Sequence, residues 1–303
     1  MTLQTVQSPN RNLWMAALKP PMYSVAVMPI LVGSVIAYAE TGTLHGGVFA
    51  TFLLSAVLLL VWENLSNDVF DAETGIDANK HHSLVNLTRN RALIFNIGNG
   101  CLALGIVGIC SIALSQRDFT VLGLILVCCG LGYLYQGPPF RLGYQGLGEP
   151  LCFISFAVGV MAAYYSQTQQ WSYAAAAAAA MIGMTTTLVL FCSHFHQVDD
   201  DLAAGKRSPI VRLGTLRGAQ LMPWLCVSVF AIALIATTLQ VFPRWTFLFL
   251  GSLPLAVRLC RHVLRHHDQP GLVQNAKFVA ISFHFWSGLL LCGSFLLASV
   301  SPI

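Results

Sequence analysis

Four side chains that carry oxygen atoms follow one another at helical spacing close to the end of an apolar stretch. Asn64, Asn67, Asp68 and Asp71 are spaced i, i+3, i+4 and i+7, which places them on one helical face if the helix of the apolar run continues through them. Carboxylate and amide oxygens are ligands for hard cations such as Mg²⁺, which usually also keep waters and phosphate oxygens of a substrate. A wet helix end with solvated acids explains one or two of these residues, but a full polar stripe favours a magnesium site.

A second acidic cluster lies in the later part of the chain. Asp199, Asp200 and Asp201 are consecutive, and adjacent aspartates repel one another unless a cation is close. Seven of the twelve acidic residues lie within 68–77 and 199–201. This concentration indicates that the two clusters share a task, whereas Glu73 and Asp77 at the end of the first cluster are interpreted as solvated loop residues.

Two other readings apply to the second cluster. Lys206 and Arg207 follow it closely, so a salt-bridged loop is one alternative. His194 and His196 precede it, but no histidine or cysteine set with the spacing of a zinc site is present. We therefore interpret the histidines as local hydrogen-bonding or substrate-contacting groups.

Several basic residues could complement the acidic clusters. Arg89 and Arg91 follow the first cluster, and Lys206, Arg207 and Arg212 follow the second. Lys19 opens the first predicted span, and Arg141 lies in the segment "YQGPPFRLGYQGLGE". Each one alone is explained by the excess of Lys and Arg on the cytoplasmic side of membrane proteins. Acid pairs and cations on one face of a helical bundle nevertheless suit a polyanion, such as a diphosphate, that is bridged by a metal ion.

The composition shows what kind of fold must position these groups. Of 303 residues, 56% are hydrophobic and 9% are charged, whereas soluble domains carry about 25% charged residues. The mean hydropathy is +0.68, and we therefore expect an integral membrane protein. The net charge is only +4 without a block of Lys or Arg, so no nucleic-acid partner is expected. The nine cysteines form no C-x-x-C pair and are interpreted as small apolar residues.

The hydropathy pattern predicts an all-α, polytopic fold with nine transmembrane helices in one bundle around a central cavity. The predicted spans lie near 22–39, 46–67, 92–114, 119–136, 147–166, 171–194, 219–241, 245–262 and 277–300. The separation of the third span from the fourth depends on the short polar sequence "SQRD" at 115–118. We expect a single domain over 1–303, with a polar tail at about 1–12.

The distribution of Lys and Arg predicts the orientation. With nine spans, 14 of the 16 basic residues lie on the side of the N-terminus, which is therefore expected to be cytoplasmic. The loops on this side, at 68–91, 137–146, 195–218 and 263–276, are longer and more polar than the others. Because loops that only connect helices tend to be short, we expect the functional site on this face.

These residues resemble a known family. "NLSNDVFDAETGID" is similar to the first aspartate-rich motif, N-x-x-N-D-x-x-D, of the UbiA-type membrane prenyltransferases. "LKPPMYSVAVMPILVGS", "YQGPPFRLGYQGLGEP" and "DDDLAAGKRSPIVRLG" resemble the branch that prenylates 1,4-dihydroxy-2-naphthoate, and "KHHSLVNLT" and "HFHQVDDDLAAGKRSPIVRLG" resemble the cyanobacterial and plastid phytyltransferases of that branch. The resemblance extends from about residue 13 to residue 300.

The resemblance implies roles for individual residues. Asp68, Asp71 and Asp201 are implied to be catalytic, and Mg²⁺ is implied to be held by the following set: Asn64, Asn67, Asp68, Asp71, Asp199, Asp200 and Asp201. Diphosphate binding is implied for Lys19, Arg141 and Lys206, and substrate binding for Tyr133, Tyr135, His196 and Gln197. The chain departs from the family at Gln197, where the second motif, Asp-x-x-x-Asp, normally begins with an acid. The missing carboxylate can be replaced by Asp199, by Asp200 or by the neutral oxygen of Gln197.

The reaction implied by the resemblance is the transfer of a phytyl group from its diphosphate to 1,4-dihydroxy-2-naphthoate, with loss of CO₂ and diphosphate, as in phylloquinone biosynthesis. A bacterial inner membrane, with the active site on the cytoplasmic side, is the implied location. Transfer of a longer polyprenyl group in menaquinone biosynthesis is an alternative, as is a homogentisate or chlorophyllide prenyltransferase. An ion-coupled transporter is the alternative from another class, but acids at one membrane face fit it less well than acids near the midplane.

Overall fold

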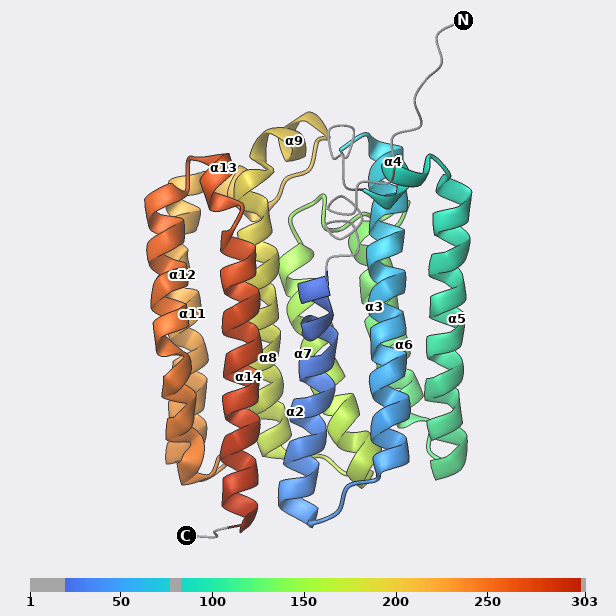
Figure 1. The fold of residues 1–303 in the computed structure, drawn as a ribbon, viewed down its shortest axis with the longest axis vertical. Helices are drawn as coiled ribbons and strands as arrows, with labels where there is room; N and C mark the ends of the chain where they lie inside the picture. Colours follow the sequence, from blue (N-terminus) through green and yellow to red (C-terminus); the bar gives the residue numbers. More distant parts are fainter. Residues whose placement is uncertain (1–19, 77–82, 301–303) are drawn as a thin grey trace, which may run out of the picture.

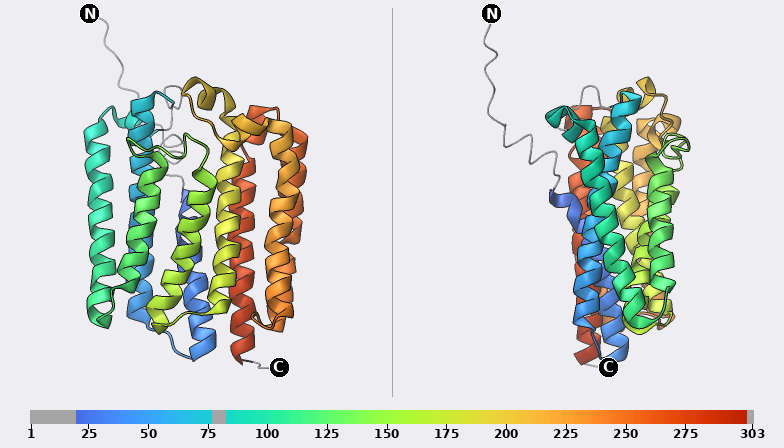
Figure 2. Two further views of the ribbon diagram at one scale, coloured as in Figure 1. Left: turned by 180° about the vertical axis from the view of Figure 1, so that it is seen from behind. Right: turned by 90° about the vertical axis from the view of Figure 1, so that its right-hand side faces the viewer.

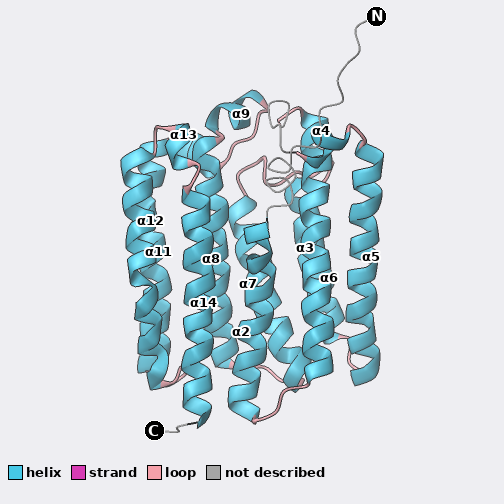
Figure 3. Cartoon of the chain, in the orientation of Figure 1, coloured by secondary structure: helices cyan, strands magenta, loops and turns pink. Residues whose placement is uncertain are grey.

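In the computed structural model, residues 20–76 and 83–300 are described, and all regular structure within them is helical (Figure 3). The long α-helices are α2 (Tyr23–Thr41), α3 (Gly46–Thr74), α5 (Arg91–Gln116), α6 (Thr120–Gln136), α7 (Gly148–Thr168), α8 (Tyr173–Ser193), α11 (Thr215–Thr238), α12 (Leu253–His266) and α14 (Ala276–Val300). The short α-helices are α4 (Leu84–Thr88), α9 (Val198–Ala203), α10 (Pro209–Leu213) and α13 (Pro270–Val273). The 3₁₀ helices are η1 (Pro20–Met22), η2 (His194–His196) and η3 (Arg244–Ser252).

The predicted spans correspond to these helices. Within the described residues, eight helical segments are long and apolar enough to cross a membrane, and Thr120–Gln136 is a shorter apolar helix. The "SQRD" turn is present, since α5 ends at Gln116 and Arg117 adopts a left-handed conformation with φ 55°. The eighth span is composite, because η3 continues into α12. The prediction of an all-helical membrane fold is thus confirmed, whereas the central cavity stays a prediction.

The long helices form two facing rows (Figures 1 and 2). In one row α12, α14, α2, α3 and α5 follow one another, and in the other α11, α8, α7 and α6 do so. Contacts between α11 and α12 and between α5 and α6 close the two ends. The side view in Figure 2 shows the resulting flattened bundle. Helix α8 is the most buried of the candidate spans and carries much of the contact between the rows.

The short helices gather at one end of this bundle. Figure 1 shows α4, α9 and α13 at the end where α2 begins, and the loop between α6 and α7 lies at the same end. Helix α3 reaches this end because it does not stop at the last apolar residue but continues to Thr74. Gly75 then ends the helix with φ 76°, a left-handed conformation that glycine adopts without a steric penalty. The first acidic motif is therefore helical, as its spacing predicts.

Candidate active site between two acidic motifs

The first motif lies on the last turns of α3, where its carboxylates are fixed by neighbouring segments. Asp68 is only 1% exposed, and its Oδ2 accepts a hydrogen bond of 2.9 Å from the backbone N–H of Leu84 at the start of α4. Asn64 and Asn67 are half-buried on the preceding turns. A buried carboxylate needs hydrogen-bond donors or a cation, so α4 holds Asp68 in place beside the chain that follows the motif.

Asp71, one turn further along α3, is fixed from the loop between α6 and α7. The hydroxyl of Tyr144 donates a hydrogen bond of 2.9 Å to Asp71 Oδ1 and lies 2.7 Å from Thr74 Oγ1. Burial of Tyr144 and the negative charge of Asp71 both raise the pKa of the Tyr144 hydroxyl. Tyr144 is therefore a neutral hydrogen-bond donor at neutral pH, and it orients one oxygen of Asp71.

The second motif is centred on Asp201, which is completely buried. Its Oδ1 lies 3.3 Å from Lys206 Nζ, and its Oδ2 lies 3.4 Å from His194 Nδ1. Burial alone raises the pKa of the Asp201 carboxyl, but the contact with His194 and the charge of Lys206 outweigh it and hold the pKa below its usual value. Asp201 is thus an ionised carboxylate held between two basic groups.

Tyr144 and Lys206 join the two motifs. The Lys206 ammonium lies 5.7 Å from the centre of the Tyr144 ring, an arrangement that favours the cation. The backbone N–H of Arg207 also donates a hydrogen bond of 2.7 Å to the carbonyl oxygen of Tyr144. A continuous set of contacts therefore runs from Asp71 through Tyr144 and Lys206 to Asp201, across the end of the bundle.

Three residues could replace the acid that the second motif lacks at position 197, and they differ in exposure. Asp199 and Asp200 are exposed on α9, whereas Gln197 is half-buried just before it. The carbonyl oxygen of Gln197 accepts a hydrogen bond of 2.8 Å from the backbone N–H of Asp201. His196 is half-buried in η2. The two carboxylates are thus exposed at this face, whereas the backbone of Gln197 is bonded to that of the buried Asp201.

The basic residue Arg141 is held by an acid that the sequence interpretation assigned to solvent. Arg141 Nη2 lies 2.8 Å from Glu73 Oε2, and Arg91 pairs with the other oxygen of Glu73. Glu73 is exposed, as expected, but it lies on α3 rather than in a loop. It is ion-paired because the end of α3 meets both the loop after α6 and the start of α5. Lys19 and Asp77 lie outside the described residues.

The two tyrosines at the end of α6 are in different surroundings. The Tyr133 hydroxyl donates a hydrogen bond of 2.7 Å to the carbonyl oxygen of Pro138. The rings of Tyr133 and Phe70 on α3 form a T-shaped contact with 6.1 Å between their centroids. Tyr135 lies against Gly143 and Gly148, where an added Cβ would come within 2.8 Å and 2.7 Å of its ring. Tyr135 therefore packs into the loop that carries Tyr144.

Two groups at this site, Tyr144 and Glu149, were missed by the sequence interpretation. Tyr144 was not selected, although it lies in the quoted loop "FRLGYQGLGE" between Arg141 and α7. His194 was interpreted as a local hydrogen-bonding or substrate-contacting group, and it does contact the nearby Asp201. It also contacts Glu149, whose Oε1 lies 3.3 Å from His194 Nε2. Glu149 is the single acid of the quoted segment and lies in the first turn of α7. That position favours an acid, and it is the sequence signal from which Glu149 could have been selected.

The donor set fits a hard cation that is shared with a substrate. Among residues 20–76 and 83–300, no group of three or more His, Cys, Asp or Glu side chains forms a ready-made metal cage. Mg²⁺ is usually held by one or two carboxylates together with waters and substrate phosphates rather than by a closed protein cage. The oxygen donors of the α3 stripe satisfy that requirement, and the cysteines, all free thiols, are not needed.

The contact between Tyr144 and Asp71 yields a testable prediction. We expect Tyr144→Phe to weaken Mg²⁺-dependent catalysis by about 10- to 100-fold, because Asp71 loses the donor that orients it. The measurement is the Mg²⁺ concentration for half-maximal activity of the purified protein. Tyr173→Phe, at a residue that is 87% exposed, is the matched control. Unchanged Mg²⁺ dependence in Tyr144→Phe would show that the hydroxyl does not position Asp71.

The fold and site define a class: an all-helical membrane protein with two oxygen-rich acidic motifs joined at one end of its bundle. Residues 26–289 match the UbiA prenyltransferase family, and the chain belongs to that family. A UbiA homolog from Archaeoglobus fulgidus, solved with GPP and Mg²⁺ bound, has the same fold, with a TM-score of 0.57 and 13% identity over 93% of this chain and 99% of that one.

Curated relatives are similar over nearly the whole chain. The 2-carboxy-1,4-naphthoquinone phytyltransferase of Synechocystis is 54% identical over 94% of this chain and 93% of its own length. The chloroplastic 2-carboxy-1,4-naphthoquinone phytyltransferase of Arabidopsis thaliana is 39% identical over 95% of this chain and 78% of its own length. The family and branch indicated by the sequence motifs are thus confirmed.

Proposed function

We propose that this chain is a phytyltransferase that transfers a phytyl group from its diphosphate to 1,4-dihydroxy-2-naphthoate and releases CO₂ and diphosphate. The product is demethylphylloquinol, the precursor of phylloquinone. The observation that carries the proposal is the 54% identity to the Synechocystis phytyltransferase along nearly the full length of both chains. The acidic motifs joined at one face of the bundle supply a place for the diphosphate.

The acceptor is assigned as the dihydroxy form because the chemistry requires an electron-rich ring. The bond between the allylic carbon and the diphosphate oxygen breaks, and its electron pair leaves with diphosphate. A ring electron pair then forms the new carbon–carbon bond at the carbon that bears the carboxylate. That carboxylate leaves as CO₂, and the electron pair of its broken bond restores the aromatic ring. No residue is needed to remove a ring proton.

The α3 stripe and the acids of the second motif are proposed to hold Mg²⁺ and the diphosphate between them. The proposed ligands are Asn64, Asn67, Asp68, Asp71, Asp199, Asp200 and Asp201. Bound Mg²⁺ would neutralise the charge that develops on the leaving diphosphate. Lys19, Arg141 and Lys206 are proposed to donate charge-assisted hydrogen bonds to the same group. For Lys206 this means sharing its ammonium between the diphosphate and Asp201, from which it is 3.3 Å away.

The contacts within the site hold its acidic side chains in position before the reaction. Tyr144 orients Asp71, with a hydrogen bond of 2.9 Å, and His194 and Lys206 keep Asp201 ionised. Groups that are positioned before the reaction need no reorganisation when charge develops on the leaving group. Tyr133 and Tyr135 are proposed to face the allylic cation, which aromatic rings stabilise, and His196 and Gln197 to contact the naphthoate.

The isoprenoid tail and the membrane location complete the proposal. The chain is a multi-pass membrane protein, and a hydrophobic tail can lie between its spans and the lipid. We propose a bacterial inner membrane, with the N-terminus and the active site on the cytoplasmic side. The support is the sequence count, which assigns 14 of the 16 basic residues to that side when nine spans are assumed.

A donor panel tests the assignment. Purified protein receives 1,4-dihydroxy-2-naphthoate with equal amounts of phytyl, geranylgeranyl and solanesyl diphosphate, with Mg²⁺ or with a chelator, and products are identified by mass. We expect the phytyl product to dominate and to disappear with the chelator. A dominant solanesyl product would instead indicate menaquinone biosynthesis. Ion-driven uptake into liposomes without diphosphate release would support a transporter and contradict the proposal.

A further inference from the structure

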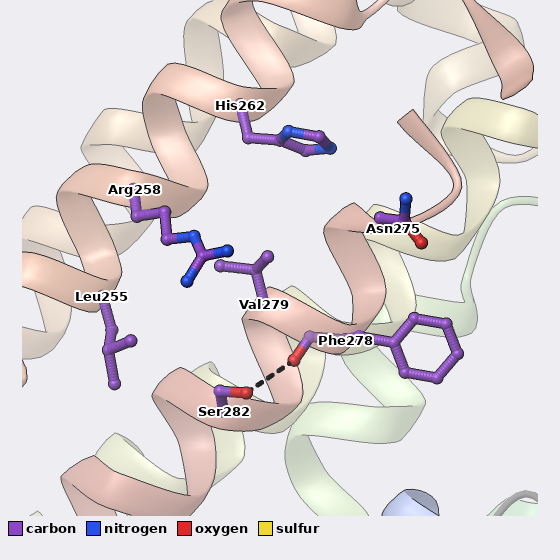
Figure 4. Close-up of a pocket in the computed structure, with 7 residues that line it drawn as sticks. All are labelled: Leu255, Arg258, His262, Asn275, Phe278, Val279 and Ser282. Carbon is purple, nitrogen blue, oxygen red and sulfur yellow. Dashed lines mark hydrogen bonds between the residues drawn. The ribbon is translucent and has the colours of Figure 1, made fainter. Parts of the chain in front are cut away.

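A second polar site lies in the wall of the bundle between α12 and α14, at the edge of the row that contains α3. A cavity of about 400 Å³ is present there (Figure 4). Its polar lining includes Arg258, His262 and Asn275, and its apolar lining includes Leu255, Phe278 and Val279. Helices α14 and α2 separate α12 from α3 within this row, so the cavity is distinct from the acidic motifs.

Arg258 is the unusual group in this cavity. It lies about 12 Å before the end of α12 at His266, given a rise of about 1.5 Å per residue, and its side chain is exposed. No ion pair joins it to a carboxylate among the residues that the structure describes. An arginine this far along a membrane-spanning helix requires an anion or a route to the headgroup region.

The surroundings of Arg258 are basic and contain hydrogen-bond donors. From Arg244 to Val300 the chain has one acid, Asp268, whereas four Lys or Arg residues lie on α12 and at the start of α14: Arg258, Arg261, Arg265 and Lys277. Asn275 adds a side-chain amide to the lining of the cavity (Figure 4). The hydroxyl of Ser282, which also lines the cavity, already donates a hydrogen bond of 2.9 Å to the carbonyl oxygen of Phe278.

This combination matches the chemistry of one ligand. A guanidinium and an amide beside apolar side chains suit a phosphate group that is attached to an acyl chain. Basic pockets between transmembrane helices near a membrane surface bind anionic headgroups in this way. We propose that the cavity between α12 and α14 binds an anionic phospholipid, with Arg258 and Asn275 donating to its phosphate and Leu255, Phe278 and Val279 contacting the first part of its acyl chains.

The position of the cavity links it to the second acidic motif. Val273 on α13 and Ala276 on α14 are fully buried in the same core cluster as Phe195 and Ile210, which flank the motif in the sequence. A lipid that bridges α12 and α14 therefore stabilises the corner on which η2 and α10 pack. Bound lipid is expected to raise the thermal stability of the protein.

The test measures lipid binding rather than catalysis, so its failure is independent of the proposed function. Protein in a neutral detergent is titrated with phosphatidylglycerol or with phosphatidylcholine of the same acyl chains, and bound lipid is counted by native mass spectrometry. We expect selective binding of phosphatidylglycerol, and about fivefold weaker binding in Arg258→Gln, from the contribution of one basic residue near a membrane surface. Arg261→Gln, an exposed arginine on the same helix that does not line the cavity, is expected to bind like the unmodified protein.

The opposite results overturn the proposal. Equal losses in Arg258→Gln and Arg261→Gln would indicate only diffuse attraction to a basic surface, and equal binding of phosphatidylcholine would remove the role of the phosphate charge. Displacement of the lipid by glycerol 3-phosphate would show a soluble-anion site instead. If Arg258→Gln does not fold, Asn275→Asp places a negative charge in the cavity, and unchanged lipid binding by that variant contradicts the proposal equally.

Discussion

Replacing Asp71 with Asn is expected to lower Mg²⁺-dependent prenyl transfer by about a hundredfold or more, since a ligand loss exceeds the usual cost of losing a supporting hydrogen bond. The side chain keeps its shape and can still accept from Tyr144, whose hydroxyl lies 2.9 Å away. The charge that would hold Mg²⁺ is lost. The measurement is the initial rate of product formation as Mg²⁺ is varied, with folding checked by thermal unfolding in detergent.

Asp268→Asn is the matched control for this variant. Asp268 is exposed and lies after α12, at the same end of the bundle but outside both motifs. Its loss is expected to leave the rate and the Mg²⁺ requirement unchanged. If Asp71→Asn retains the full rate at every Mg²⁺ concentration, the assignment of the α3 stripe as a metal site fails.

The second large effect is expected at Asp201, where stability and catalysis change together. Asp201→Asn removes a completely buried charge that lies within 3.4 Å of His194 and 3.3 Å of Lys206. Breaking a buried ion pair by removing one partner typically costs about 3–5 kcal/mol, and we expect a loss near the lower limit because Lys206 is partly exposed. The checks are the thermal unfolding midpoint in detergent and the rate of prenyl transfer, both of which should fall.

Asp199→Asn and Asp200→Asn separate the effect on stability from the effect on metal binding in the second motif. Both residues are exposed, so their loss should leave the unfolding midpoint unchanged while raising the Mg²⁺ requirement if either one is a ligand. An Asp201→Asn variant as stable as the original protein would contradict the buried ion pair. If Asp199→Asn, Asp200→Asn and Gln197→Ala all retain the original Mg²⁺ requirement, the second site depends on Asp201 alone.

The bundle was predictable because length and hydropathy alone determine which segments can cross a bilayer. The stripe on α3 was predictable for a similar reason: the spacing of Asn64, Asn67, Asp68 and Asp71 depends only on helical geometry. Helix α3 continues to Thr74, so all four residues of the stripe are helical, as their spacing predicts.

The contacts between segments were not predictable in this way. Tyr144 reaches Asp71 across 73 positions of the chain, and no periodicity reports the path of the loop that carries it. The ion pair of Glu73 was not predictable because its partner Arg141 is 68 positions away. His194 bridges Glu149 and Asp201 only once α7, α8 and α9 are packed. Local patterns identify which residues can do chemistry, and tertiary structure decides which of them are held together.

The most direct test follows the carboxyl carbon of the acceptor. Purified protein is given phytyl diphosphate, Mg²⁺ and 1,4-dihydroxy-2-naphthoate labelled with ¹³C in the carboxyl group. We expect equal amounts of labelled CO₂, diphosphate and unlabelled demethylphylloquinol or its quinone. Release of diphosphate without a prenylated naphthalene product, or a prenylated product that keeps the label, would contradict it.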